Sequence, residues 1–136
     1  SWCPGCLDPE HKRAYPWGEA APNCNRAVFD EEEFGCGKQS TWPVESKPAG
    51  LSAYGAHDLG GNVWEWTSDW YDARAYVDRD NVANPTGPEA GETRVLRGGS
   101  WATQPPYLRA AGRLKYLPPP SFQDVGVGFR CVVSAE

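Results

Sequence analysis

Methionine is absent from this sequence, histidine occurs twice, and no apolar run is long enough to cross a membrane. The two histidines do not lie at a metal-ligand spacing from the cysteines. Basic residues are outnumbered by acidic ones, and the net charge of −5 argues against a nucleic-acid-binding surface. Helical periodicity is nearly absent. Fifteen glycines and thirteen prolines among 136 residues therefore indicate one loop-rich domain with a single core.

The five cysteines are an odd number. Cys3 and Cys6 form a Cys-Pro-Gly-Cys pair that could be half of a metal site, although a complete zinc site needs about four ligands. Cys24 and Cys36 flank an acidic loop and could close it as a disulfide, which leaves Cys131 over. Free thiols are the alternative for all five.

The stretch 58–70 is the centre of the predicted core, because it holds three of the seven tryptophans. Gly60 and Gly61 have no Cβ atom and allow a tight turn. The β-branched and aromatic residues that follow predict a strand. Side chains alternate along a strand, so Trp64 and Trp66 share one face, and we expect both to be buried.

Two later segments are also predicted to be strands. Thr93–Arg97 is β-branched and apolar in part, and a pair of glycines ends it. Val125–Val133 alternates apolar and small residues. The polar stretch 72–92 between the first two strands is punctuated by proline and glycine, and it predicts a packed surface loop.

Four motifs carry a family resemblance, and in chain order they are Tyr15-Pro16-Trp17-Gly18, Gly61-Asn62-Val63-Trp64-Glu65-Trp66, Arg97-Gly98-Gly99-Ser100-Trp101 and Gly128-Phe129-Arg130-Cys131. Their order and spacing resemble the formylglycine-generating-enzyme (sulfatase-modifying factor) superfamily over most of the chain. The resemblance implies an α+β, C-type-lectin-like fold of the formylglycine-generating-enzyme subtype, with a small twisted sheet and many loops. The first elements of a full-length member have no counterpart here, so residues 1–136 are interpreted as one domain trimmed at its N-terminus.

The same resemblance implies that the domain is not an enzyme. The enzymes of the superfamily bind copper through two cysteines spaced C-x4-C, soon after the Gly-Gly-Ser motif. The matching positions here are Thr103 and Leu108. Because Cu(I) selects thiolate ligands, no copper site of that kind is expected. Cys131 matches a family cysteine that is structural.

A structural calcium ion is a further implication of the resemblance. Its ligands would be two carboxylates, those of Asp58 and Glu65, and two backbone carbonyls, those of Gly61 and Val63. Calcium takes about 6–8 oxygen ligands, and a glycine turn lets carbonyls converge. The alternative is that Glu65 pairs with a buried arginine such as Arg97 or Arg130.

The C-terminal third is similar to the variable proteins of diversity-generating retroelements, in which fixed scaffold residues alternate with positions diversified from Asn codons by adenine mutagenesis. This resemblance implies ligand-binding slots at Ala102, Thr103, Gln104, Pro106, Tyr107, Gly112, Leu114, Lys115, Tyr116, Leu117, Phe122, Asp124, Val125 and Gly126. All except Gln104 and Lys115 can be reached from an Asn codon by changing adenines only. An ordinary loop surface is the alternative interpretation.

Between the slots, scaffold residues are expected to hold the loops in place. The apolar ones, expected to point inward, are Trp101, Leu108, Ala111 and Phe129. The basic ones, expected to bind loop carbonyls or carboxylates because a buried charge needs partners, are Arg109, Arg113 and Arg130.

The sequence thus predicts a non-catalytic binding module that displays a variable loop surface to an unknown ligand, most plausibly another protein. No nucleic-acid partner and no membrane span are expected. The alternatives are an enzyme of the formylglycine-generating type, and a lectin-like or regulatory domain of a larger protein such as a kinase or a secreted protein.

Overall fold

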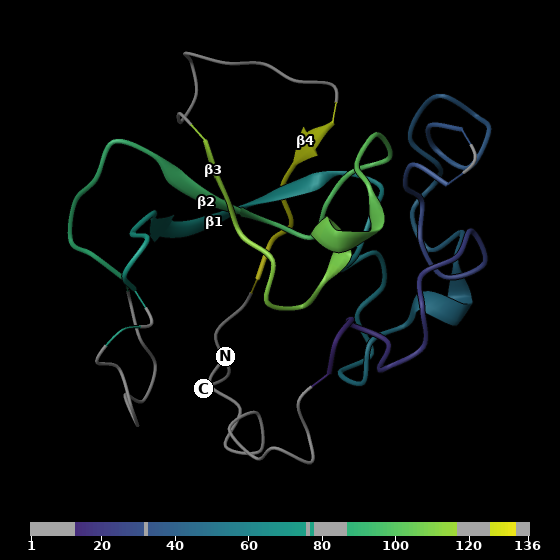
Figure 1. Ribbon diagram of the computed structural model, residues 1–136, viewed down its shortest axis with the longest axis horizontal. Helices are drawn as coiled ribbons and strands as arrows, with labels where there is room; N and C mark the ends of the chain where they lie inside the picture. The colour runs from purple at the N-terminus through teal and green to yellow at the C-terminus, as the bar shows by residue number, and fades with distance from the viewer. Residues whose placement is uncertain (1–12, 32, 76, 78–86, 117–125, 133–136) are drawn as a thin grey trace.

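The computed structural model describes residues 13–31, 33–75, 77, 87–116 and 126–132. In these ranges the elements are, in chain order, η3 (Pro48–Gly50), β1 (Trp64–Trp70), β2 (Arg94–Arg97), η4 (Pro105–Leu108), β3 (Leu114–Tyr116) and β4 (Val127–Gly128). η3 and η4 are short 3-10 helices. Loops from the first half of the chain lie on one side of the molecule, and the sheet lies on the other (Figure 1). No helix in the described ranges is long and apolar enough to span a membrane.

The four strands form one mixed sheet in the order β3-β2-β1-β4. β1 pairs antiparallel with β2 and parallel with β4, and β2 pairs antiparallel with β3. Glu65 on β1 lies opposite Arg97 on β2, and Trp66 lies opposite Leu96. The predicted strands after the glycine turn and over Thr93–Arg97 are confirmed, as is the small sheet in a loop-rich domain.

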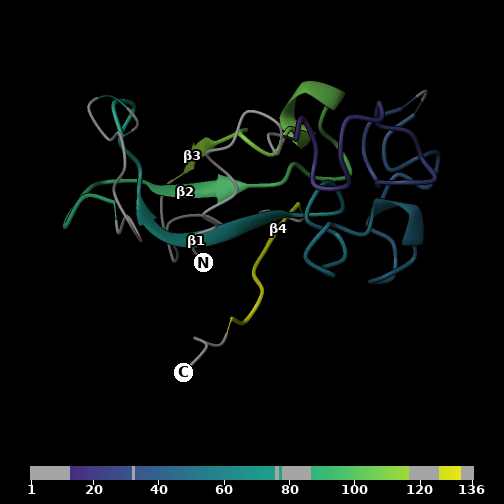
Figure 2. The same cartoon turned by 90° about the horizontal axis from the view of Figure 1, so that it is seen from below.

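Burial along β1 follows the prediction only at its first residue. Trp64 is buried, with 6% of its surface exposed. Trp66 is only half-buried, under a tilted contact with Tyr116 whose ring centroid lies 6.3 Å away. Figures 1 and 2 show that β1 runs away from the loop layer, so residues farther along the strand lose that cover. The expectation that Trp66 is buried was therefore wrong.

The last strand is also shorter than predicted, because β4 covers only Val127–Gly128. Beyond it, 77% of the surface of Phe129 is exposed. Arg130 turns toward the loop before β1 instead of continuing the strand, and its guanidinium donates to the carbonyls of His57 (3.0 Å) and Asp58 (3.2 Å).

A left-handed turn at Gly61 and Asn62 joins the loops to the sheet. The two residues have φ values of 86° and 67°. A Cβ on Gly61 would meet the Val28 carbonyl oxygen at 2.5 Å, so glycine is required there. The Gly61 amide donates to the Gly98 carbonyl (2.8 Å), and the Asn62 amide donates to the Val28 carbonyl (2.8 Å). The Asn62 carbonyl in turn accepts from the Trp101 amide (2.9 Å).

The side chain of Asn62 adds a further loop, that of Trp42, to this junction. Its Oδ1 accepts from the Trp42 amide (3.0 Å) and its Nδ2 donates to the Trp42 carbonyl (3.1 Å). Asn62 is 7% exposed, so both bonds are largely shielded from water. The tight turn predicted from the two glycines is confirmed, and its asparagine is as important as its glycines.

Around the junction lies the apolar core, whose buried members are Ala27, Val28, Phe29, Trp64, Val95, Leu96 and Leu108. Three consecutive members come from a loop rather than a strand, which explains how a domain with so little regular structure builds a core. Tyr15 and Trp17 pack against it from the N-terminal side.

The cysteine alternatives are settled for three residues. Cys24 and Cys36 form a disulfide, and Cys131 is free and exposed. Cys3 and Cys6 lie outside the described residues.

Asn62→Gly should lower the free energy of unfolding by about 1–3 kcal/mol, because the Trp42 amide and carbonyl lose their partners. Asn62→Ala should cost about 1–2 kcal/mol more, because alanine is strained at a left-handed φ whereas glycine is not. Denaturant titration measures both differences. Wild-type stability of the glycine variant would show that the junction does not depend on this side chain.

Candidate ligand-binding surface

The segment 102–107, here called the display loop, leads into and along η4. Pro105 lies at the first position of η4, where its missing N–H costs nothing. Leu108 ends the helix, is fully buried, and belongs to the same cluster as Ala27 and Phe29. The helix is thereby anchored by its last residue, while the preceding residues face outward.

Tyr107 has both a supported and an open side. Its ring packs edge-on against the buried Trp64 ring, with centroids 6.0 Å apart, yet 48% of the residue is exposed. An aromatic ring that packs on the core with one side and is exposed on the other offers contact area to a ligand with little loss of conformational entropy on binding.

Thr103 behaves differently from its neighbours, because it holds the display loop in place. Its Oγ1 accepts from the Ser100 amide (2.8 Å) and donates to the Ser100 carbonyl (2.9 Å). Its own carbonyl accepts from the Asp30 amide (3.0 Å). The side chain therefore closes a turn and is only half-exposed.

The predicted slots fall into groups by exposure. The exposed ones are Ala102, Gln104, Pro106, Tyr107 and Lys115. The half-buried ones are Thr103, Gly112, Leu114 and Tyr116, whereas Gly126 is buried and its carbonyl accepts from the Trp64 amide. Leu117, Phe122, Asp124 and Val125 lie outside the described residues. The structure thus brings together an exposed set before and along η4, whereas Lys115, on β3, lies over the Tyr71 ring.

The predicted scaffold residues are confirmed only in part. Leu108 is buried and Trp101 half-buried, whereas Ala111 and Phe129 are exposed, so the inward orientation predicted for these two was wrong. Ala111 lies in a turn that leads to β3, and Phe129 lies beyond the short β4, so neither faces the core.

The three scaffold arginines also differ. Arg113 donates to the Asp72 carbonyl (3.0 Å), and Arg130 binds both carbonyls and a carboxylate, as predicted. Arg109 is exposed, and its guanidinium makes no hydrogen bond or ion pair with a described residue, so its predicted holding role was wrong. A side chain that reaches solvent needs no partner for its charge.

Glu65 and Arg130 form the ion pair that the sequence left open as an alternative to calcium binding. Arg130 Nε donates to Glu65 Oε2 at 2.7 Å, and Arg130 Nη2 contacts Glu65 Oε1. The hydrogen bond to Glu65, helped by the nearby charges of Glu65 and Asp58, raises the pKa of Arg130 against the opposing effect of burial. The pair ties the end of the described chain to β1.

In this arrangement the two carboxylates proposed as calcium ligands already have other partners. Both oxygens of Glu65 already contact a cation, and Asp58 Oδ2 accepts from the Glu45 amide (2.7 Å). No cluster of three or more acidic, histidine or cysteine side chains suited to a metal occurs in the described ranges. Calcium at Asp58, Gly61, Val63 and Glu65 remains a prediction, and it requires the ion pair to open.

Two structurally important residues were missed or misassigned from sequence. Asn62 was read only as part of a motif, although asparagine after a glycine pair is a signal for a left-handed turn. Arg97 was considered as a partner for Glu65, its cross-strand neighbour. Its guanidinium instead donates to the carbonyls of Gly112 (2.6 Å) and Ala110 (2.8 Å).

Comparisons with known proteins agree with the sequence motifs. The family model for the sulfatase-modifying factor enzyme 1-like domain matches residues 2–135. The formylglycine-generating enzyme of Mus musculus is 34% identical over 96% of this chain and 36% of its own length. The hercynine oxygenase of Mycolicibacterium smegmatis is 39% identical over 75% of this chain and 24% of its own length. The chain thus spans about a third of the first relative and about a quarter of the second.

Among solved structures, Treponema denticola variable protein 1 matches with a TM-score of 0.58 and 31% identity, over 77% of this chain and 34% of that one. The resemblance to formylglycine-generating enzymes and to variable proteins is therefore confirmed, and with it the C-type-lectin-like fold.

The expectation that the domain is not an enzyme was wrong as drawn from the sequence. Two of the relatives just described are named as enzymes, and one of them is an oxygenase rather than a formylglycine-generating enzyme. The missing cysteine pair excludes one way to hold copper, but a fold can carry several chemistries at different sites.

Arg130→Met should lower the free energy of unfolding by about 1 kcal/mol, because a partly exposed ion pair and two carbonyl bonds are lost. Arg74→Met is the matched control. Arg74 is exposed and no described contact involves its side chain, so the change should be about 0.5 kcal/mol or less. Equal effects of the two substitutions in denaturant titration would contradict the role of the pair.

The same variant tests the calcium prediction. Because Arg130 contacts both carboxylate oxygens of Glu65, calcium should bind the Arg130→Met variant more tightly than wild type in calorimetric titration. Glu65→Gln should abolish calcium binding. No binding to either protein at millimolar calcium would overturn the predicted site.

Proposed function

The chain belongs to the sulfatase-modifying factor enzyme 1-like domain family. We propose that within this family it is a binding module that contacts another protein through its display loop. The proposal includes diversification of this loop between copies of the gene. The calcium ion, if bound, has a structural role and does not contact the ligand.

The observation that carries the proposal is the division between Leu108 and the residues before it. Leu108 is fully buried, while Gln104, Pro106 and Tyr107 are exposed in the same short segment. Exposed residues of this kind can change without loss of the core, and proline limits the entropy lost when the loop is contacted. The similarity to a protein named a variable protein supports the same function.

A protein partner fits the chemistry of the surface better than a nucleic acid does. Tyrosine provides a large contact area with a polar tip, which is typical of protein-recognition loops. The net charge of −5 disfavours a polyanion.

Stability should be insensitive to the display residues and sensitive to their anchors. We expect Gln104→Ala and Pro106→Ala each to change the free energy of unfolding by about 0.5 kcal/mol or less. Leu108→Ala should cost about 2–5 kcal/mol, as a fully buried leucine does. Thr103→Val should cost about 1–3 kcal/mol, because the Ser100 amide loses its acceptor. Denaturant titration measures these changes. A Gln104 variant as unstable as the Leu108 variant would contradict the division between exposed display residues and buried anchors.

Binding itself is tested with a photo-crosslinking amino acid at position 107 in the full-length protein, in its own host. A specific crosslinked protein is expected there and not from position 44, because Val44 is 77% exposed but lies outside the display loop. The crosslink should disappear when Gln104 and Pro106 are changed together. Equal capture from both positions would contradict the proposal, as would coding DNA from several isolates without adenine-directed changes at codons 102, 103, 106 and 107.

A second candidate is a part of a larger enzyme, either of the formylglycine-generating type or an oxygenase, as the names of the two relatives suggest. Full-length protein assayed with copper on a Cys-x-Pro-x-Arg peptide tests the formylglycine-generating form of this candidate. Product formation would favour it over a role in binding alone.

A further inference from the structure

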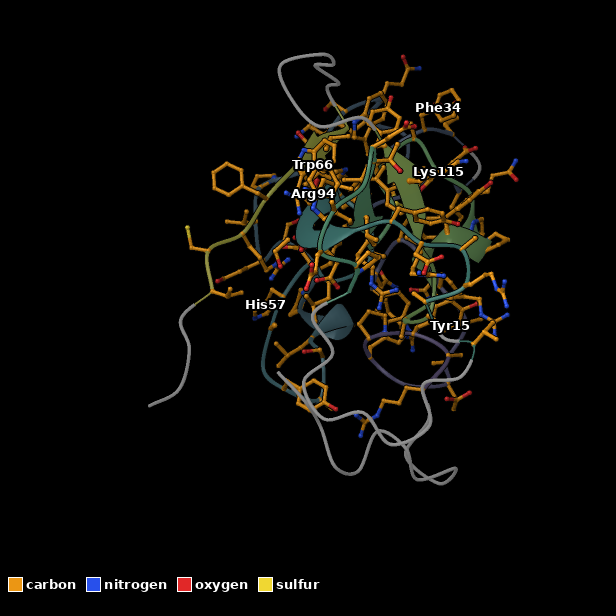
Figure 3. All side chains as sticks on the ribbon, turned by 90° about the vertical axis from the view of Figure 1, so that its left-hand side faces the viewer. Tyr15, Phe34, His57, Trp66, Arg94 and Lys115 are labelled. Atoms are coloured by element: carbon orange, nitrogen blue, oxygen red, sulfur yellow. A yellow bond between two sulfur atoms is a disulfide. The ribbon has the colours of Figure 1, made fainter. Side chains whose placement is uncertain are left out.

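A cleft of about 840 Å³ lies between the N-terminal loop, the end of β2 and the segment after η4. It is lined by described residues of both halves of the chain, and none of the display-loop residues lines it. Figure 3 shows Tyr15, which belongs to the cleft, well apart from Lys115 and Trp66. The cleft is therefore distinct from the surface proposed above and is argued independently of it.

The walls of the cleft are held in place by hydrogen bonds and stacking. The Ala110 amide donates to the Ala14 carbonyl (2.8 Å), which ties the segment after η4 to the N-terminal loop. Tyr15 and Gly18 exchange two backbone bonds of 3.0 Å. The Tyr15 ring stacks on Trp17, with centroids 5.3 Å apart and planes 4° from parallel. Because both rings pack against the core, the Tyr15 ring is a fixed, flat part of the wall.

Three arginines carry the positive charge of the cleft. Arg97, at the end of β2, donates to two backbone carbonyls and has no carboxylate partner among the described residues. The guanidinium of Arg109 makes no hydrogen bond or ion pair with a described residue, and Arg13 is exposed at the rim. Guanidinium groups that meet only neutral carbonyls or solvent keep their full charge available to a ligand.

Two glutamates also line the cleft, but each already has a partner. Glu65 is paired with Arg130, and Glu19 Oε1 accepts from the Ala14 amide (2.8 Å). The excess of cationic groups stands out in a chain of net charge −5, and a concave wall concentrates their field.

We propose that this cleft binds a small organic carboxylate with a flat apolar body. The carboxylate contacts Arg109 and Arg97, since the guanidinium fork matches its two oxygens. The apolar body lies against the Tyr15 ring, with Pro16 and Leu59 in the same wall. A free aromatic acid and the C-terminal aromatic residue of a peptide share this chemistry.

The test uses N-acetylphenylalanine, its uncharged amide and a tripeptide that ends in phenylalanine, each titrated by calorimetry into the chain. The acid should bind at least about tenfold more tightly than the amide, because one or more charge-assisted hydrogen bonds are lost in the amide. Tighter binding of the peptide than of the acid would identify a chain terminus as the source, and the reverse order a free acid. Equal affinity for the acid and the amide would overturn the proposal. So would the absence of binding when any of the probes is present at about 10 mM.

Arg109→Gln should weaken binding of the acid by about tenfold or more, and Arg109→Lys, which keeps the charge but not the fork, by less. Since the Arg109 side chain is exposed and makes no hydrogen bond with a described residue, both variants should fold, and circular dichroism checks this. Arg74→Gln is the matched control, because Arg74 is exposed and does not line the cleft. An unchanged affinity in folded Arg109→Gln, or sulfate that competes as strongly as the acid, would overturn the assignment.

Discussion

The left-handed turn at Gly61 and Asn62 is the constraint on which the rest of the domain depends. Through one carbonyl, two amides and one side-chain amide, it holds Val28, Trp42, Gly98 and Trp101 together. A chain with so few strand residues cannot rely on ladders to satisfy its backbone, so loop polar groups need specific partners. The junction supplies them where three loops meet the start of β1, and the core residues of the loop layer become buried as a result.

The features that depend on local chemistry could be predicted from sequence. The glycine pair predicts the turn, and the aromatic, β-branched run after it predicts β1. What failed depends on what covers each residue. Trp66 alternates correctly with Trp64 but is only half-buried, and Phe129 belongs to a motif but lies past the end of β4. Alternation states which face a side chain occupies, whereas burial needs a second layer over that face.

Prediction of the candidate binding surface from sequence has the same limit. Thr103 and Gln104 are adjacent slots by the motif argument, yet Thr103 closes a turn with Ser100 while Gln104 faces solvent. Their difference comes from hydrogen bonds that sequence spacing does not reveal. If the loop is diversified, serine at position 103 keeps the hydroxyl and its bonds, whereas most other replacements lose them. Tolerance to change is thus a property of single positions and not of the whole segment.

Leu108 separates the two candidate binding regions. The display loop precedes it and the cleft wall of Arg109, Ala110 and Ala111 follows it directly. Because Leu108 is fully buried, its position is set by the core, and the backbone on either side is fixed by separate bonds, from Thr103 on one side and Ala110 on the other. The display loop and the wall of the cleft are thus held by different hydrogen bonds. A scaffold built in this way can alter one surface while it keeps the other constant, which is the physical requirement for a domain family that hosts both variable binding surfaces and fixed chemical sites.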